Sequence, residues 1–72
     1  MRFQVGDIVR VIDSTAFFYN VVGQIKEVTD EDYLVVFIAI NDETGEEFIY
    51  EDCYYYEDQI MKEEILWLQC KQ

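Results

Sequence analysis

The 72-residue sequence contains no histidine and no proline, one serine, two cysteines and five basic residues. Without histidine, the commonest general base near neutral pH is missing, and Ser14 has no activating partner in the sequence. Cys53 stands among carboxylates, whose negative field disfavours the thiolate that a nucleophilic cysteine requires. Paired carboxylates can hydrolyse glycosides, but only in a deep cleft that so short a chain can hardly enclose. We therefore predict a protein that is not an enzyme.

The two cysteines, Cys53 and Cys70, provide little for metal binding. They are spaced 17 residues apart, whereas a zinc site needs four ligands in close pairs. Residues 41–47, NDETGEE, are rich in oxygen ligands but lack the D-x-[DN]-x-[DN]-G register of a calcium loop. We predict no metal and no cofactor. The cysteines fit thiols of a reducing compartment, with a disulfide between them as the alternative.

Long hydrophobic runs are also missing. The longest unbroken apolar run, residues 33–40, is far shorter than the roughly 20 residues that cross a bilayer as a helix. The N-terminus reaches Asp7 without the apolar region of a signal peptide. We expect a soluble, cytoplasmic protein that does not contact membranes.

Acidic residues are the most prominent feature that is present. The chain has 16 acids against five bases, a formal net charge of −11. Residues 27–64 hold fourteen of these acids and a single base, Lys62. Because affinity for phosphates comes chiefly from Lys and Arg, this composition argues against direct nucleic-acid binding. The same residues attract any basic protein surface.

The hydrophobic pattern predicts one folded domain over residues 1–72. Hydrophobic residues make up 51% of the chain, and a chain this short has material for one core only. Alternation predicts strands at residues 7–12, 23–28, 33–40 and 47–51, a short turn at 55–59, and a closing strand near 60–63. Residues 33–40 are nearly all apolar, which is typical of a strand covered on both sides. Residues 65–68 are expected to pack, as strand or helix, over the end of a small, mainly β, five-stranded and partly open barrel.

Three short motifs in this pattern resemble those of a known family of folds. Gly6-Asp7 opens the first strand, an aromatic loop Phe17-Phe18-Tyr19-Asn20 follows, and Gly23 opens the second strand. Over about residues 5–60 the chain resembles SH3-like barrels, including KOW-type modules, the photosystem I subunit IV family and the small SH3-like subunit of the photosynthetic NDH complex. The resemblance implies a fold and a tendency to dock other proteins. KOW modules that bind RNA are basic, and this chain is acidic.

The aromatic residues have two interpretations each. Strand alternation cannot bury all of Tyr50, Tyr54, Tyr55 and Tyr56, so we expect one to be buried and two to be partly exposed. Exposed tyrosine beside acids would supply the contact area that surface ion pairs lack. The loop residues 17–19 either cover the core or form a docking site. Trp67 and Cys70 either pack on the barrel or form a dimer contact.

The acids likewise serve solubility alone or form a binding face, and the net charge exceeds the 2–8 usual for solubility. By size and charge the chain resembles small acidic phage inhibitors such as anti-CRISPR proteins. We predict a nucleic-acid mimic, monomeric or weakly dimeric, that binds the basic surface of a nucleic-acid-binding effector. The alternative is an accessory SH3-like subunit that docks in a larger complex through residues 17–19. The expected binding residues, gathered on one side, are Asp30, Glu31, Asp32, Asp42, Glu43, Glu46, Glu47, Glu51 and Asp52, with Tyr54 and Tyr55 as anchors.

Overall fold

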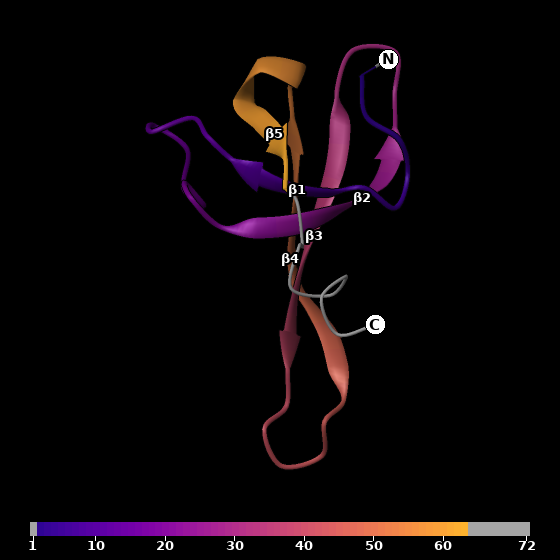
Figure 1. Ribbon diagram of the computed structural model, residues 1–72, viewed down its shortest axis with the longest axis vertical. Helices are drawn as coiled ribbons and strands as arrows, with labels where there is room; N and C mark the ends of the chain where they lie inside the picture. Colours follow the sequence, from indigo (N-terminus) through magenta and orange to yellow (C-terminus); the bar gives the residue numbers. More distant parts are fainter. Residues whose placement is uncertain (1, 64–72) are drawn as a thin grey trace.

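The computed structural model describes residues 2–63, which form one antiparallel sheet of five strands in the order β4-β3-β2-β1-β5 (Figure 1). The prediction of a mainly β, five-stranded and partly open fold is confirmed, because the two edge strands do not pair to close the sheet. The elements are β1 (Ile8–Val11), β2 (Val22–Val28), β3 (Tyr33–Ile40), β4 (Glu47–Tyr55), a 3-10 turn η1 (Glu57–Gln59) and β5 (Ile60–Lys62).

The predicted element boundaries are close to those observed, except at β4. This strand continues to Tyr55 rather than ending at Glu51, because Tyr54 and Tyr55 stay paired with the start of β3. The predicted turn is the 3-10 turn η1, and the closing strand is β5. Residues 65–68, for which we predicted packing over the barrel end, lie outside the described residues.

The core lies on one face of the sheet and follows the strand period of two. Val9 and Val11 of β1, Ile25 of β2 and Val35 of β3 are almost fully buried there. Tyr33 is also fully buried, and its hydroxyl accepts hydrogen bonds from the backbone N–H groups of residues 2 and 3, at 3.1 and 3.4 Å. The N-terminal segment is thereby fixed over the start of β3.

Gly23 allows β2 and β3 to approach closely. A Cβ at this position would lie 2.6 Å from Cγ1 of Val35 and 2.8 Å from the carbonyl oxygen of Val36. Contacts that short do not occur in folded proteins, so the absence of a side chain is required here. Glycine at position 23, near the start of the second strand, is therefore required by the packing of β2 against β3.

The long connection between β1 and β2 covers one end of the core. Phe18 is half-buried and stacks on Phe37 at a ring separation of 4.7 Å, whereas Phe17 is 94% exposed. Asn20 adopts a left-handed conformation, φ 70°, which asparagine tolerates better than most residues. The interpretation of this loop as a cover over the core holds for Phe18 and not for Phe17.

The distal part of the β3–β4 hairpin projects beyond the core as an arm, residues 38–50 (Figure 1). The expectation that residues 33–40 are covered on both sides is correct for Tyr33 to Phe37 and wrong for the rest, since Ile38 and Ile40 are 40% and 61% exposed. A bulge at Tyr50, between the pairs Phe37–Glu51 and Ile38–Ile49, marks where the arm leaves the core.

Candidate interaction surface

The tip of the arm presents four exposed acids on a hydrogen-bonded turn. The Asn41 side chain accepts hydrogen bonds from the N–H groups of Glu43 and Thr44, at 2.9 and 3.3 Å. The N–H of Gly45 donates to the Asn41 carbonyl at 2.7 Å, and Gly45 adopts a left-handed conformation, with a φ of 76°. This turn holds the carboxylates outward in solvent; they are Asp42, Glu43, Glu46 and Glu47.

A second acidic group lies on the β2–β3 turn. The hydroxyl of Thr29 accepts hydrogen bonds from the N–H groups of Glu31 and Asp32, at 3.2 and 2.9 Å, and it donates to the Asp32 carboxylate. Asp32 is half-buried and used within the turn, whereas Asp30 and Glu31 are exposed. Two of the three predicted acids are therefore available to a partner.

The two acidic groups lie at opposite ends of the molecule, whose longest extent is 37 Å (Figure 1). The acids predicted to gather on one side do not form a single compact patch. Strand β4 runs between the two ends and carries Glu51 and Asp52, both exposed, near the middle. The acids thus follow the β3–β4 hairpin lengthwise instead of covering one face.

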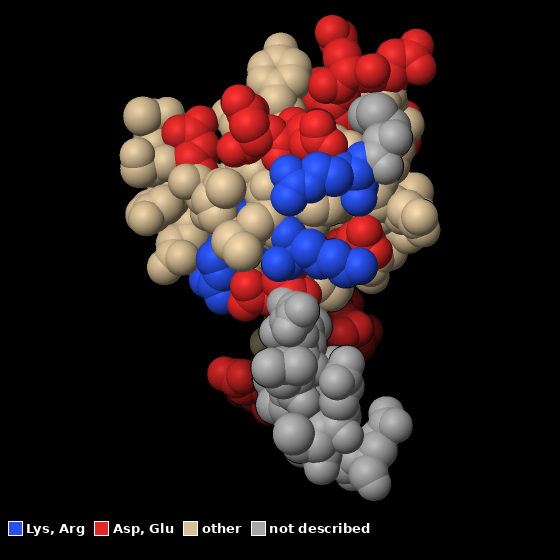
Figure 2. Space-filling model, turned by 45° about the horizontal axis from the view of Figure 1, so that its top comes forward, with Lys and Arg blue, Asp and Glu red and all other residues tan. Residues whose placement is uncertain are grey.

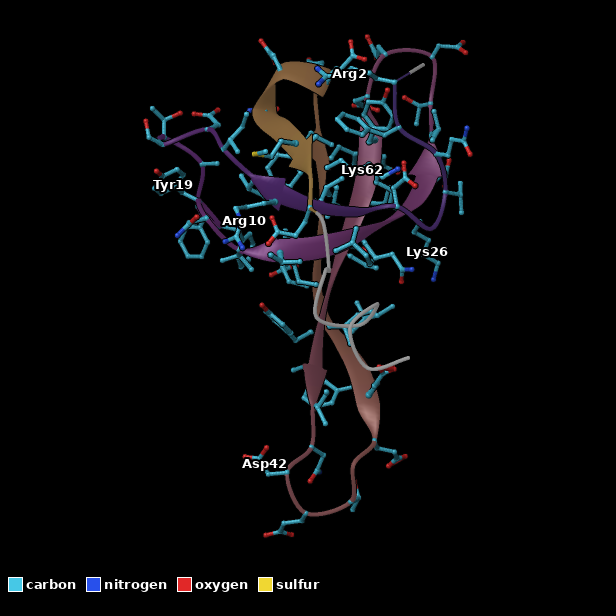
Figure 3. The ribbon with its side chains drawn as sticks, in the orientation of Figure 1. Arg2, Arg10, Tyr19, Lys26, Asp42 and Lys62 are labelled. Atoms are coloured by element: carbon cyan, nitrogen blue, oxygen red, sulfur yellow. The ribbon has the colours of Figure 1, made fainter. Side chains whose placement is uncertain are left out.

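Positive charge is placed elsewhere in the sheet. Of the four described bases, Arg2 precedes the sheet, Arg10 lies on β1, Lys26 on β2 and Lys62 on β5. In Figure 2 basic side chains lie together across the middle of one face, with acidic side chains forming a band above them. Figure 3 places Asp42 at the far end of the arm from all four bases. The arm tip is consequently the most purely acidic part of the described surface.

The Arg10 guanidinium is occupied within the fold. It forms two hydrogen bonds with Glu63, Nε to Oε1 at 3.1 Å and Nη2 to Oε2 at 2.5 Å, and Nη1 donates to the Asn20 carbonyl at 2.8 Å. These hydrogen bonds lower the pKa of Glu63 and raise that of Arg10. Arg10 therefore links β1, the long loop and the end of β5.

The predicted tyrosine anchors have opposite environments. Tyr54 pairs with Leu34 on the outer side of the sheet and is 53% exposed. Tyr55 pairs with Tyr33, points into the core and is 4% exposed, so the prediction that it anchors a partner is wrong. Burial, with the neighbouring Cys53 thiol, raises the pKa of Tyr55. The exposed tyrosines that accompany the acids are Tyr50, Tyr54 and Tyr56.

Sequence reasoning missed Tyr50 and Tyr56 as surface tyrosines. The alternation of side chains along a strand could have identified Tyr56. Tyr54 and Tyr56 flank Tyr55, so burial of Tyr55 turns both neighbours outward. The orientation of Tyr50 cannot be obtained in this way, because the bulge interrupts the alternation along β4. One of the four tyrosines is buried, as expected, and the other three are exposed.

Within residues 2–63 no helix is long and apolar enough to cross a membrane. Among the same residues, no three acidic or cysteine side chains converge to form a metal site. Cys53 is half-buried next to the core. Whether it pairs with Cys70 is not settled by the structure, because Cys70 lies outside the described residues.

No protein-family model matches the chain, and a search of curated proteins finds no match.

Proposed function

We propose that this protein binds the basic surface of a nucleic-acid-binding protein and competes there with the nucleic acid. The observation that carries the proposal is the separation of charge: residues 27–58 contain twelve acids and no base. Six of these acids lie on the β3–β4 hairpin, and the other six lie at the end of β2, on the β2–β3 turn and on η1. A basic groove that binds the phosphates of a nucleic acid would attract this base-free stretch of carboxylates.

The arm supplies the shape for this competition. It is narrow, projects beyond the core and carries acids at its tip. Tyr50 lies at the base of the arm, and Tyr54 lies beyond it on β4. Carboxylates steer a basic partner and raise the association rate, while tyrosine provides apolar contact together with a hydroxyl. Small acidic phage inhibitors, including anti-CRISPR proteins, are the class of protein that this proposal describes. Their targets act on nucleic acid inside the cell, so the proposal places the protein in the cytoplasm.

The test is to capture partners on the immobilised protein at about 0.05 M and about 0.5 M salt, where the Debye length falls from roughly 14 to 4 Å. A captured protein supports the proposal only if it binds nucleic acid and loses that binding when this protein is added. Retention at high salt, or simultaneous binding of nucleic acid and this protein, would contradict it.

Two double variants with the same net charge test the position of the site. Glu46→Gln with Glu47→Gln removes two charges from the arm tip, and Gln4→Lys with Ser14→Lys makes the same change of net charge at exposed positions outside the hairpin. Because exposed ion pairs contribute up to about 1 kcal/mol each, we expect the tip variant to weaken binding about 5- to 30-fold and the control only slightly. Equal losses would show that only net charge matters.

Phe17 favours the second candidate function, an accessory subunit that docks through the long loop. Its ring is 94% exposed beside the half-buried Phe18. In that case Phe17→Ala abolishes capture, salt has little effect, and the tip variant binds normally. Phe18→Ala is unsuitable for this comparison because Phe18 also packs on Phe37.

A further inference from the structure

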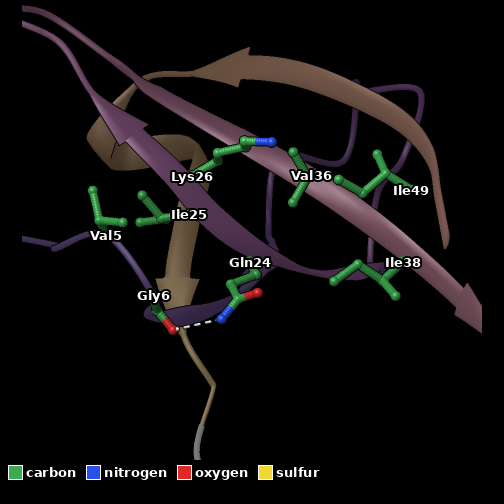
Figure 4. Close-up of a pocket in the computed structure, with 8 residues that line it drawn as sticks. All are labelled: Val5, Gly6, Gln24, Ile25, Lys26, Val36, Ile38 and Ile49. Carbon is green, nitrogen blue, oxygen red and sulfur yellow. Dashed lines mark hydrogen bonds between the residues drawn. The ribbon is translucent and has the colours of Figure 1, made fainter. Parts of the chain in front are cut away.

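An apolar groove lies on the sheet face opposite the core. Two adjoining hollows form it, and they share Gln24 and Ile38. Figure 4 shows the residues that line the first of them. The core side of β1 and β2 is taken by Val9 and Ile25, so Ile8 and Val22, with the opposite parity, belong to the groove. We call this surface the outer groove and define it by its aliphatic residues: Ile8, Val22, Ile38, Ile40 and Ile49.

The outer groove has the composition of a covered surface. An antiparallel sheet with one solvated face normally alternates apolar residues inward with polar residues outward. Here four strands contribute branched aliphatic side chains to the outward face, and most of them are exposed. Three polar residues also line the hollows: Gln24, which already donates a hydrogen bond to the Gly6 carbonyl at 3.1 Å, and the exposed Lys26 and Glu47. The groove therefore offers apolar contact and fits an apolar occupant.

The described part of the chain ends at the border of this groove. The N–H of Glu63 donates to the carbonyl of Ile8 at 2.8 Å, and Ile8 lines the groove. The Glu63 side chain is held by two hydrogen bonds from Arg10. The described part of the chain thus stops beside β1, next to the groove.

The sequence that follows has the composition and the length to cover it. Four consecutive apolar residues begin two positions after Glu63: Ile65, Leu66, Trp67 and Leu68. The groove crosses from β1 to β4, three strand spacings or about 14 Å. An extended chain advances about 3.3 Å per residue, so four to five residues span that distance. A segment as long as residues 64–68 is therefore sufficient to span the groove from Ile8 to Ile49 when extended.

Charge favours this segment over a second copy of the protein. Each copy carries a net charge of −11, so pairing two copies brings like charges together. The segment after Glu63 has one acid and one base, Glu64 and Lys71, and adds no net charge. Its attachment next to the groove also gives it a millimolar effective concentration.

We propose that residues 64–72 dock intramolecularly in the outer groove, with the side chains of residues 65–68 against Val22, Ile38 and Ile40. The C-terminal segment then completes the fold as a cover on the second face of the sheet. This inference does not depend on the proposed partner binding, because it rests on the apolar lining of the groove. The groove borders the arm tip, since Glu47 lines its second hollow.

Trp67 provides a direct test, because it is the only tryptophan in the chain. We would record its emission maximum and acrylamide quenching in the full chain, with a synthetic peptide of residues 64–72 as the reference for an exposed ring. The groove variant is Ile38→Ser with Ile40→Ser. The control is Ile12→Ser with Phe17→Ser, two exposed apolar residues outside the groove.

The proposal predicts a blue-shifted and protected Trp67 in the wild type and the control, at all protein concentrations, and loss of protection to the peptide value in the groove variant. A wild-type Trp67 that already matches the peptide would overturn the proposal. Protection that disappears on dilution, with dimers detected by sedimentation, would overturn it in favour of a second copy. Protection unchanged in a folded groove variant would show that the segment packs elsewhere.

A measurement on the wild type covers the case in which the groove variant does not fold. Nuclear Overhauser contacts between the Trp67 ring and the methyl groups of Val22, Ile38 or Ile40 are expected. Contacts of the ring with other methyl groups only, or with none, would contradict the proposal.

Discussion

Tyr54 and Tyr55 are adjacent in sequence but belong to different parts of the molecule. Tyr55 closes the core, 4% exposed, and its ring meets Phe37 edge-on at 6.3 Å; Tyr54 lies on the outer side, 53% exposed. A run of three tyrosines between acids thus combines one core residue with surface contacts. Its composition alone does not separate these roles.

Replacing each of these tyrosines by alanine is expected to separate stability from binding. Tyr55→Ala should cost about 3–5 kcal/mol, against a total of about 4–11 kcal/mol for a domain of this length. Tyr54→Ala should change stability by no more than about 0.5 kcal/mol and weaken partner capture. Urea unfolding measures the first effect. Equal destabilisation by both variants would contradict the assignment of Tyr54 to the surface.

Gly23→Ala is expected to destabilise the protein by about 1–3 kcal/mol through overpacking. The added methyl group would meet Val35 and the backbone of Val36. Gly45→Ala is the matched control, because no atom lies within 4 Å and only the left-handed φ of 76° opposes it, at about 1 kcal/mol. Thermal unfolding should rank Gly23→Ala as the more damaging change, with shifted methyl signals of Val35. The reverse order would show that β2 and β3 separate easily.

At the level of elements, the sequence predicts local structure better than it predicts exposure. Both hairpins, the turn at Gly45 and the strand at residues 33–40 follow from turn chemistry and periodicity, which are local properties. The exposure of Ile38 and Ile40 does not, because it depends on how far β2 extends beside β3, and the pairing of the two strands stops at Gln24 and Val36. The acids were correctly expected at the surface, but their division between two ends depends on hairpin length and on the bulge at Tyr50.

The link between β1 and the end of β5 is expected to weaken in acid. The pKa of Glu63 is lowered by hydrogen bonds from Arg10, so the folded state favours the carboxylate. This contribution is fully present above the ordinary pKa of 4.5 and is lost as the pH falls through the lower folded value. Glu63→Gln should therefore be less stable than the wild type at pH 7, and the difference should shrink below about pH 4.

Urea unfolding of both proteins across this pH range gives the measurement. Comparing the two cancels the general relief of repulsion among the other acids, which acts on both. A difference between the proteins that stays constant with pH would contradict the role of the ionised Glu63 carboxylate.

At the scale of the whole molecule, the net charge of −11 opposes the folded state. Raising NaCl from about 0.01 M to about 1 M shortens the Debye length from roughly 30 to 3 Å and screens this repulsion. The melting temperature is expected to rise with salt, and to rise less in the variant with Gln4→Lys and Ser14→Lys. Screening should at the same time weaken partner capture. A melting temperature that falls with NaCl would indicate that the salt-sensitive pairs, such as Arg10–Glu63, outweigh the repulsion.

The position of β4 at the edge of the sheet has a consequence for handling the protein. Among residues 2–63, its nine residues hydrogen-bond to β3 on one side only, and they include Phe48, Ile49 and Tyr50, which are exposed. Such an edge is a template for adding further strands, and the ionised side chains of Glu47, Glu51 and Asp52 keep neighbouring molecules apart. Near the isoelectric point of about 4.1 the net charge that keeps the molecules apart is close to zero. Acidic storage should then lead to fibrils that grow from this edge.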